Sequence, residues 1–201
     1  MAFTSRSEAA RTAILDAVRD LLARKGFAGT TIRAVAAEAS VDPSMVMRYY
    51  GSKEDLLAAA LDVDLHLPDP AQCRPERLGR TLAEHMISRW EGQLADGLIL
   101  MLLRSASNSR LAAQRYREMF ESQVLGLIRA VIGDTPDTAR RAGLVAAQAA
   151  GVALCRYVLE IPPVAALEGE ELAALLAPVL QHYLTGNLTS LPLPSTLDAK
   201  T

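Results

Sequence analysis

Apolar residues recur at helical spacing through most of the chain. Six of them in the first such stretch share one helical face: Ala10, Ile14, Ala17, Val18, Leu21 and Leu22. This spacing is typical of an amphipathic helix with one buried stripe. Ser5 followed by Glu8 fits a capping box at the start of that helix, and Gly26 fits its end.

Short amphipathic stretches with strong capping signals follow. The pattern predicts a second helix from Thr30 or Thr31 to about Ala39, with its apolar residues facing inward. Asp42 fits an N-cap, and Pro43 suits the first position of a third helix, where a missing N–H costs nothing. We therefore expect the third helix over residues 43–50, with a fourth beginning after a Ser52 cap.

The rest of the chain also has helical periodicity, after a proline-rich break over residues 67–70. Further helices are predicted at about 75–91, 94–107, 110–133, 136–160 and 168–187. No stretch indicates a strand. The fold class is therefore all-α, with about nine helices: an N-terminal helix-turn-helix domain over 1–61 and a larger helical bundle over 62–187. Pro192 and Pro194, without periodicity around them, predict a mobile tail over 188–201.

Composition agrees with a helical globular protein. Half of the 201 residues are hydrophobic, which excludes wholesale disorder. Ala (34) and Leu (31) outnumber the residues that favour strands. The net charge is −2, and residues 1–61 carry 8 basic and 7 acidic side chains. Any nucleic-acid contact must therefore come from individually placed residues rather than from a strongly basic surface.

Several classes of function lack their sequence signatures. The two cysteines, Cys73 and Cys155, have no metal or redox spacing, and the three histidines share no helical face, so we expect neither a metal nor another cofactor. No G-x-S-x-G, P-loop or G-x-G-x-x-G motif occurs, so no enzyme is indicated. The longest apolar stretch, 142–155, is too short to span a bilayer, and the N-terminus has no secretory signal. We expect a soluble cytoplasmic protein without a membrane partner.

Residues 30–50 read TTIRAVAAEASVDPSMVMRYY. A short helix, a turn of three or four residues and a second short helix make a helix-turn-helix, in which the second helix can enter a major groove while the first braces on the DNA backbone. Ala36, Val41 and Val46 are small or aliphatic, as the inward positions require. The candidates for the outward face are Ser44, Met45, Met47, Arg48 and Tyr49.

Residues 8–61 resemble the TetR (tetracycline-repressor-like) family of bacterial transcriptional regulators. The resemblance rests on an ordered set of residues: Ile14-Leu15, Gly26, Thr31-Ile32, Ala36, Ala39-Ser40-Val41, Tyr49-Tyr50 and Ser52-Lys53-Glu54-Asp55-Leu56. It implies a homodimer that binds a palindromic double-stranded DNA operator and responds to a small molecule held in the C-terminal bundle. Ser40 stands where the family usually has glycine, which is tolerable only if the turn does not require a strongly positive φ.

The resemblance implies DNA contacts at eight positions: Thr30, Thr31, Arg33, Ser44, Met45, Arg48, Tyr49 and Lys53. Arg48 on the recognition helix could pair with guanine, and Met45 offers an apolar surface to a thymine methyl. The threonines, Tyr49 and Lys53 would hold phosphates, whereas Arg33 could reach a phosphate or a base edge. The alternatives are a simple helix cap for Thr31 and a solvated surface charge for Arg33.

Two stripes in the C-terminal part favour a dimer. Small side chains recur on one helix and larger apolar ones on the last: Ala146, Ala149, Ala150 and Ala153, then Leu176, Val179, Leu180 and Tyr183. Two such helices from each subunit could form an intersubunit four-helix bundle. The alternative is that both stripes pack inside one subunit.

Candidate ligand contacts are Met, aromatic and polar residues within apolar helices: Met86, Trp90, Met101, Arg104, Met119, Gln123, Gln148 and Arg156. A pocket lined by such residues is typical of small-molecule sites, although methionines also fill cores. A buried Arg104 or Arg156 would need a partner, for which an anionic ligand is one candidate.

The leading interpretation is a homodimeric repressor that a small molecule releases from DNA. One alternative is a helical ligand- or protein-binding module with a vestigial helix-turn-helix, motivated by the near-neutral N-terminal part and by Asp42. An enzyme is the third class, and no group of residues in the sequence supports it.

Overall fold

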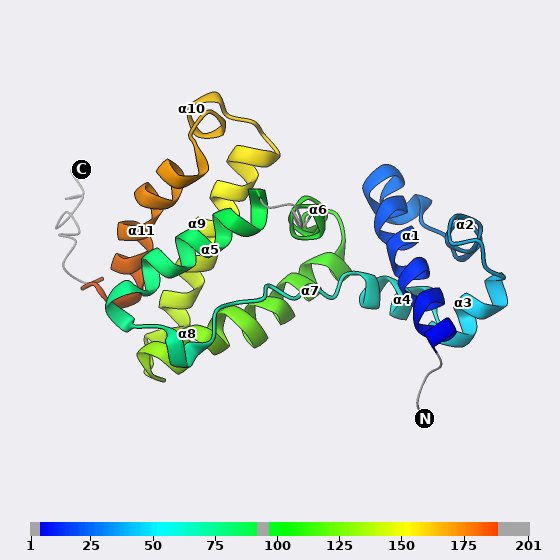
Figure 1. Cartoon of the computed structure of the whole chain (residues 1–201), viewed down its shortest axis with the longest axis horizontal. Helices are drawn as coiled ribbons and strands as arrows, with labels where there is room; N and C mark the ends of the chain where they lie inside the picture. Colours follow the sequence, from blue (N-terminus) through cyan, green and yellow to red (C-terminus); the bar gives the residue numbers. More distant parts are fainter. Residues whose placement is uncertain (1–4, 92–96, 189–201) are drawn as a thin grey trace, which may run out of the picture. The chain divides into compact units, whose positions relative to one another are not determined.

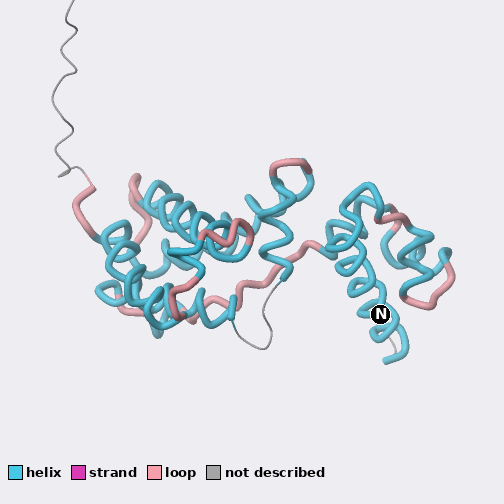
Figure 2. Tube along the Cα trace, turned by 90° about the horizontal axis from the view of Figure 1, so that it is seen from above, coloured by secondary structure: helices cyan, strands magenta, loops and turns pink. Residues whose placement is uncertain are grey.

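The computed structural model describes residues 5–91 and 97–188 (Figure 1). Within these ranges the chain is helical and contains no strand, which confirms the all-α prediction (Figure 2). Residues 189–201, most of the predicted tail, lie outside the described residues. The chain forms two compact units: the first comprises described residues 5–65, 97–121 and 157–159, and the second comprises 66–91, 122–156 and 160–188.

Helix α1 (Ser5–Gly29) begins the first unit. Its buried stripe includes Ile14, Val18 and Leu21, as the spacing predicted. Gly26 interrupts the helix with φ 64°, a conformation that glycine adopts without steric cost, so the predicted stop is confirmed. The predicted capping box depends on the side chain of Ser5, which lies outside the described side chains.

The next three helices have the expected caps. Helix α2 (Ile32–Glu38) begins after Thr31, whose side chain accepts a hydrogen bond from the Ala34 N–H. Helix α3 (Pro43–Tyr50) matches its predicted range and is capped by Asp42. Helix α4 (Lys53–Ala60) is capped by Ser52, whose Oγ accepts from the Asp55 N–H at 3.0 Å. Side-chain oxygens that satisfy the first free N–H groups fix where each helix begins.

The core of the first unit extends beyond these four helices. Helix α6 (Gly97–Ala106) and helix α7 (Arg110–Met119) contribute Ile99, Leu102 and Met119 to the same buried cluster as the N-terminal helices. The boundary predicted near residue 61 follows the end of the helix-turn-helix motif. In the structure, however, α6 and α7 belong to the same compact unit as α1–α4.

One long helix was expected over residues 110–133. The structure instead inserts a π turn, Phe120–Val124, between α7 and helix α8 (Leu125–Ile132). The chain passes from the first unit to the second within this turn, between Glu121 and Ser122. Nothing in the apolar periodicity distinguishes such a turn from regular α-helix, because it widens the helix by one residue without ending it.

The second unit is built around the contact between helix α5 (Leu78–Glu91) and helix α11 (Gly169–Thr185). The short 3₁₀ turns Pro70–Gln72 and Pro75–Arg77 precede α5. Helix α9 (Thr138–Tyr157) falls within its predicted range, and the four-residue helix α10 (Pro162–Ala165) was not predicted.

Gly79 lies where α5 and α11 approach most closely. A Cβ atom there would come within 2.7 Å of the Gln181 Cα and 2.6 Å of the Ala177 carbonyl oxygen, both in α11. The Gly79 N–H donates to Gln181 Oε1 at 2.9 Å, and Gln181 Nε2 donates to the Pro75 carbonyl at 2.8 Å. The absent side chain therefore lets the two helices touch through their backbones.

Candidate nucleic-acid interface

Helix α3 presents a narrow exposed face on a firmly buried base. Val46 is fully buried and anchors the helix in the core of the first unit. Ser44, Met47 and Arg48 are exposed, and Met45 is half-buried. Met47 has 43% of its surface exposed, so this face also presents a large apolar side chain to solvent. We therefore add Met47 to the candidate contacts, which its outward position in the motif already indicated.

The turn before α3 has the geometry of a Schellman motif. The Val41 N–H donates to the Ala36 carbonyl at 2.9 Å, and Ser40 between them has φ 53°. A left-handed residue at this position is the usual way to end a helix, and it is usually glycine. The turn therefore requires the positive φ that serine adopts only with strain, so the departure at Ser40 has a cost in stability.

Ser40→Gly is expected to raise the free energy of unfolding by about 0.5–1 kcal/mol. The left-handed conformation costs a serine more free energy than it costs a glycine, and this difference exceeds the entropy that the freer glycine gives to the unfolded chain. Urea denaturation followed by circular dichroism measures the change. Ser40→Ala is the matched control and should bring no gain. A Gly variant less stable than the natural chain would contradict the prediction.

Asp42 places a negative charge at the start of α3. Its Oδ1 accepts from the Ser44 N–H at 2.8 Å. Hydrogen bonds from the side chain and then the backbone of Ser44 hold the pKa of the Asp42 carboxyl below its ordinary value, so the group is ionised at neutral pH. The carboxylate thus stabilises the cap while opposing any approach of phosphate at this corner.

The threonines before α2 have different surroundings. Thr30 is 1% exposed, and its hydroxyl donates to the Gly26 carbonyl at 2.8 Å. A buried hydroxyl that already has a partner cannot reach DNA, so Thr30 leaves the proposed interface. Thr31 and Arg33 are exposed at the start of α2, where a phosphate contact is geometrically open.

The end of α3 carries the remaining candidates. The Arg48 guanidinium carbon lies 5.3 Å from the centre of the Tyr49 ring, a cation–π distance. Lys53, at the start of α4, donates from Nζ to the Phe27 carbonyl at 3.4 Å. An ammonium group has three donors, so this contact leaves Lys53 with the capacity to bind a phosphate.

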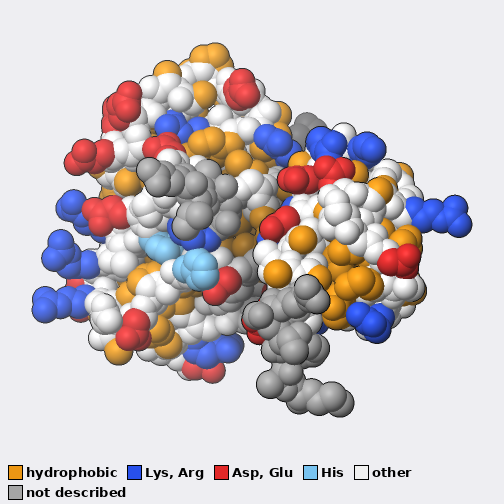
Figure 3. All heavy atoms as spheres, turned by 45° about the vertical axis from the view of Figure 1, so that its right-hand side comes forward, with side chains coloured by type: hydrophobic (Ala, Val, Ile, Leu, Met, Phe, Trp, Pro, Cys, Tyr) orange, Lys and Arg blue, Asp and Glu red, His pale blue; other side chains and the backbone are white. Residues whose placement is uncertain are grey.

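On the face drawn in Figure 3, Lys and Arg side chains are scattered among acidic and uncharged ones. That face of the described residues carries no continuous basic surface. Residues 1–61 carry 8 basic and 7 acidic side chains, so DNA binding by this part of the chain would depend on a small number of well-placed contacts.

The predicted ligand residues divide between the two units. Met101, Arg104 and Met119 belong to the first, where Met119 is buried in the core and Met101 packs against it. Arg104 is exposed and donates to the Tyr157 carbonyl at 2.9 Å. The remaining five lie in the second unit and are all half-buried: Met86, Trp90, Gln123, Gln148 and Arg156.

Arg156 does not need an anionic ligand. Its side chain is 10% exposed, and it pairs with the Glu91 carboxylate at 2.6 Å. It also donates to the Val164 carbonyl of α10 at 2.8 Å. A guanidinium with a carboxylate and a carbonyl as partners is satisfied within the protein, so the partner that a buried Arg156 was expected to need is Glu91 rather than an anionic ligand. Arg104 is exposed and needs no such partner.

A groove of about 670 Å³ lies between α5 and the first half of α11. Its lining combines apolar and charged side chains: Arg80, Glu84, Ile87, Ser88, Glu91, Gly169, Glu170, Ala173, Ala174 and Ala177. None of the predicted ligand residues lines this groove. Periodicity alone could not indicate this groove, because residues from two helices distant in sequence form it.

The predicted dimer stripes lie only partly on the surface. Leu176, Leu180 and Ala153 are buried within the second unit, so they belong to the core of the subunit. Ala146, Ala149, Ala150 and Tyr183 are half-buried, and Val179 is 37% exposed. Leu175, which belongs to the same predicted apolar stripe of the last helix, is 55% exposed. The exposed apolar face of α11 is therefore narrower than the predicted stripe.

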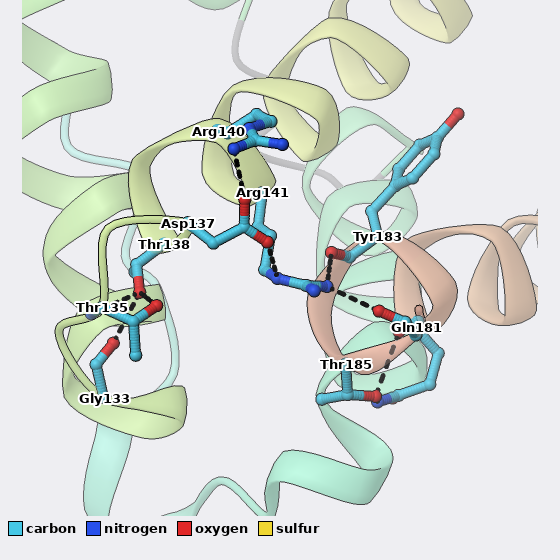
Figure 4. A network of polar contacts seen from close by, with 10 residues as sticks. Gly133, Thr135, Asp137, Thr138, Arg140, Arg141, Gln181, Tyr183 and Thr185 are labelled. Carbon is cyan, nitrogen blue, oxygen red and sulfur yellow. Dashed lines mark hydrogen bonds and ion pairs between the residues drawn. The ribbon is translucent and has the colours of Figure 1, made fainter. Parts of the chain in front are cut away.

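An arginine holds α9 and α11 together at one end. The Arg141 guanidinium lies between the Asp137 carboxylate and the end of α11 (Figure 4). Its Nη1 donates to the Tyr183 carbonyl at 2.8 Å and to the Gly186 carbonyl at 3.0 Å. A cation on the last carbonyls of a helix satisfies groups that the helix cannot bond internally. The relative placement of α9 and α11 is thus fixed by a paired charge.

Two kinds of feature are absent from residues 5–91 and 97–188. None of the helices there has the length and apolar character needed to cross a membrane. No group of three or more His, Cys, Asp or Glu side chains with the arrangement of a metal site occurs in the same part of the chain.

The fold and the exposed third helix define a helix-turn-helix protein. Residues 14–60 match the family described as bacterial regulatory proteins, tetR family, and residues 76–184 match the tetracyclin repressor-like C-terminal domain. The second match alone covers more than half of the 201 residues. The chain therefore belongs to the TetR family of bacterial regulatory proteins.

Individual relatives agree with this assignment. The HTH-type transcriptional repressor Rv3405c of Mycobacterium tuberculosis is 38% identical over 102 residues, which cover 45% of this chain and 54% of that protein. The HTH-type transcriptional regulator Mb3439c of Mycobacterium bovis matches with the same values. The alignment thus spans about half the length of the curated relatives.

Solved structures share the whole fold. The TetR-family regulator SCO0857 of Streptomyces coelicolor A3 is 26% identical with a TM-score of 0.63, over 92% of this chain and 99% of that chain. The multidrug binding protein EbrR, in its complex with proflavin, is 24% identical with a TM-score of 0.61, over 87% and 99%. At that identity the likeness to EbrR supports the fold alone.

Proposed function

We propose that this protein is a homodimeric transcriptional repressor that binds a palindromic DNA operator through α3. The observation that carries the proposal is the outer face of α3, where Ser44, Met47 and Arg48 are exposed although the helix is anchored by a fully buried Val46. A short, rigid helix with an uncovered polar and adaptable face suits insertion into a major groove. Family membership and the repressor among its relatives support this use of the helix.

The proposed contacts divide into two kinds. Ser44, Met45, Met47 and Arg48 on α3 would meet base edges, with Arg48 turning from the Tyr49 ring to a guanine. Thr31, Arg33, Tyr49 and Lys53 would hold phosphates on either side of the groove and set the register. Because the first unit is close to electrically neutral, the base contacts would carry a large share of the specificity.

Two substitutions separate these roles. Lys53→Ala should weaken binding to all sequences alike and lower the slope of log K against log salt by about 1 per subunit, because one phosphate contact is lost. Arg48→Ala should instead relax the preference at one base pair, by about 1–3 kcal/mol. Fluorescence anisotropy with the DNA upstream of the gene, over a salt series, measures both.

Lys25→Ala is the matched control, because it removes an equal charge from the exposed end of α1. Identical behaviour of the Arg48 and Lys53 variants would overturn the role assignment. Absence of salt-sensitive, sequence-preferring binding by the unsubstituted protein would overturn the proposed function itself.

The dimer is proposed to form through the uncovered faces of α9 and α11. Leu175 and Val179 are large and exposed on α11. On α9, a Cβ built at Gly143 or Gly151 would meet no atom within 4 Å, and Ala147 between them is exposed. Small residues at that spacing let a second helix approach closely, so two such helices from each subunit could form a four-helix interface. Two recognition helices would then reach successive major grooves, about 34–36 Å apart.

A small molecule bound in the second unit is proposed to weaken DNA binding. Met86 and Trp90 on α5, Gln123 in the π turn and Gln148 on α9 are the candidate contacts, all half-buried. EbrR, which shares the fold, has been crystallised with proflavin and with malachite green. Trp90 is the single tryptophan, so a change in its emission during titration with candidate ligands reports binding at α5 directly.

A further inference from the structure

Arg11 of α1 contacts both aromatic residues at the end of the recognition helix. Its guanidinium carbon lies 5.8 Å from the centre of the Tyr49 ring and 5.7 Å from the centre of the Tyr50 ring. The Tyr50 hydroxyl also donates to the Arg11 carbonyl oxygen at 3.4 Å. Side chain and backbone of one α1 residue are thus both bound to the last turn of α3.

Tyr49 carries a second cation. The Arg48 guanidinium carbon lies 5.3 Å from the same ring. Both guanidinium groups are attracted by the electron-rich face of the phenol, so the position of the ring affects where Arg48 rests. Arg48 is the proposed base-reading residue, and Arg11 lies on a different helix that has no other part in the proposed interface.

The contact adds little to the anchoring of α3 in the core. Val46 is fully buried, and Asp42 caps the helix at its other end. Tyr49 is half-buried and packs against the edge of the core. The Arg11 guanidinium adds a contact from α1 that restrains the orientation of its ring.

We infer that Arg11 is a positioning residue for DNA recognition: it fixes the Tyr49 ring and, through this ring, the resting place of the Arg48 guanidinium. The inference rests on the proposed function. It requires no contact between Arg11 and the DNA, which distinguishes it from a further phosphate contact at this position.

A double-mutant cycle tests this inference. Arg11→Gln should weaken operator binding about fivefold, the effect of losing one or two exposed cation–π contacts. The slope of log K against log salt should stay unchanged, and Arg11→Lys should restore most of the affinity because it keeps the cation. In a Tyr49→Leu background, Arg11→Gln should cause no further loss.

Two controls separate positioning from charge and from folding. Arg19→Gln removes the same charge from α1, where Arg19 instead donates to the Ala60 carbonyl, and should leave operator affinity within about twofold. Tyr50→Phe removes the hydroxyl contact with the Arg11 backbone but keeps the ring, and should likewise leave operator affinity unchanged. If Arg11→Gln lowers the slope of log K against log salt by about 1 per subunit, Arg11 contacts a phosphate directly and the inference is overturned. Additive losses of affinity in the double-mutant cycle would also overturn it, because Arg11 would then act independently of Tyr49.

A measurement without DNA separates this inference from the proposed function. In the ¹⁵N spectrum of the arginine side chains, the Arg48 Nε–H signal should be displaced by the Tyr49 ring current and should move in Arg11→Gln. If it moves but the unsubstituted protein does not bind DNA, the proposed function fails while the contact stands. If the protein binds its operator and the Arg48 signal is unchanged in Arg11→Gln, the positioning role is overturned.

Discussion

Replacing Gly79 with alanine is expected to lower the free energy of unfolding by about 2–3 kcal/mol, the upper part of the range of about 1–3 kcal/mol for overpacking a closely packed contact. The added Cβ would meet the Gln181 N and Cα and the Ala177 carbonyl oxygen. These are backbone atoms of α11, which cannot turn aside as a flexible side chain can. Relief requires α5 and α11 to move apart, which loosens the apolar contacts of Leu176 and Leu180 and the hydrogen bond from the Gly79 N–H.

Gly126→Ala is the matched control for this result. Gly126 lies within α8, and a Cβ there would meet no atom within 4 Å. Alanine in a helix is favoured over glycine, so this variant should be more stable by up to about 1 kcal/mol. Chemical denaturation of both variants measures the contrast. A Gly79→Ala protein as stable as the natural one would mean that the two helices do not approach as described.

Leu175→Glu is expected to convert the protein into a monomer and to weaken operator binding at least about a hundredfold, because a single recognition helix loses the gain from two linked half-sites. Leu175 is 55% exposed in the subunit, so a charged side chain there should leave the fold intact. In a dimer interface, the same carboxylate would be buried against apolar atoms without a partner. Sedimentation velocity gives the mass of the species, and circular dichroism checks the helix content.

Leu159→Glu is the control, because Leu159 is 65% exposed and belongs to the other unit. This variant should keep the oligomeric state and the operator affinity of the natural protein. A Leu175→Glu protein that still sediments as a dimer would place the interface elsewhere than α11.

The helix-turn-helix could be predicted closely because its signals are local. Asp42 and Ser52 are each followed directly by the helix that they cap, and Pro43 is the first residue of its helix. Each capping side chain and the N–H group it binds therefore lie two or three residues apart. The same locality marked Ser40 as the turn residue that stands where glycine is usual. The structure gives it φ 53°, the conformation that the usual glycine would supply.

The rest of the site could not be predicted, because it depends on residues distant in sequence. Periodicity showed that α11 has an apolar face but not which part its own chain covers, so Leu176 and Leu180 were assigned to the dimer although they are buried within the subunit. The partner of Arg156 is Glu91, on another helix. The contacts of Arg11 with Tyr49 and Tyr50 likewise arise only where α1 meets α3.

The near balance of charge in the N-terminal part has a consequence for how such a regulator would search a chromosome. Affinity for arbitrary duplex comes mainly from the displacement of counterions by Lys and Arg, and residues 1–61 carry 8 basic side chains against 7 acidic ones. Unrelated sequences, which outnumber true sites by many orders of magnitude, would therefore retain little of the protein. Most copies would stay unbound in the cell, free to meet an effector before they meet DNA.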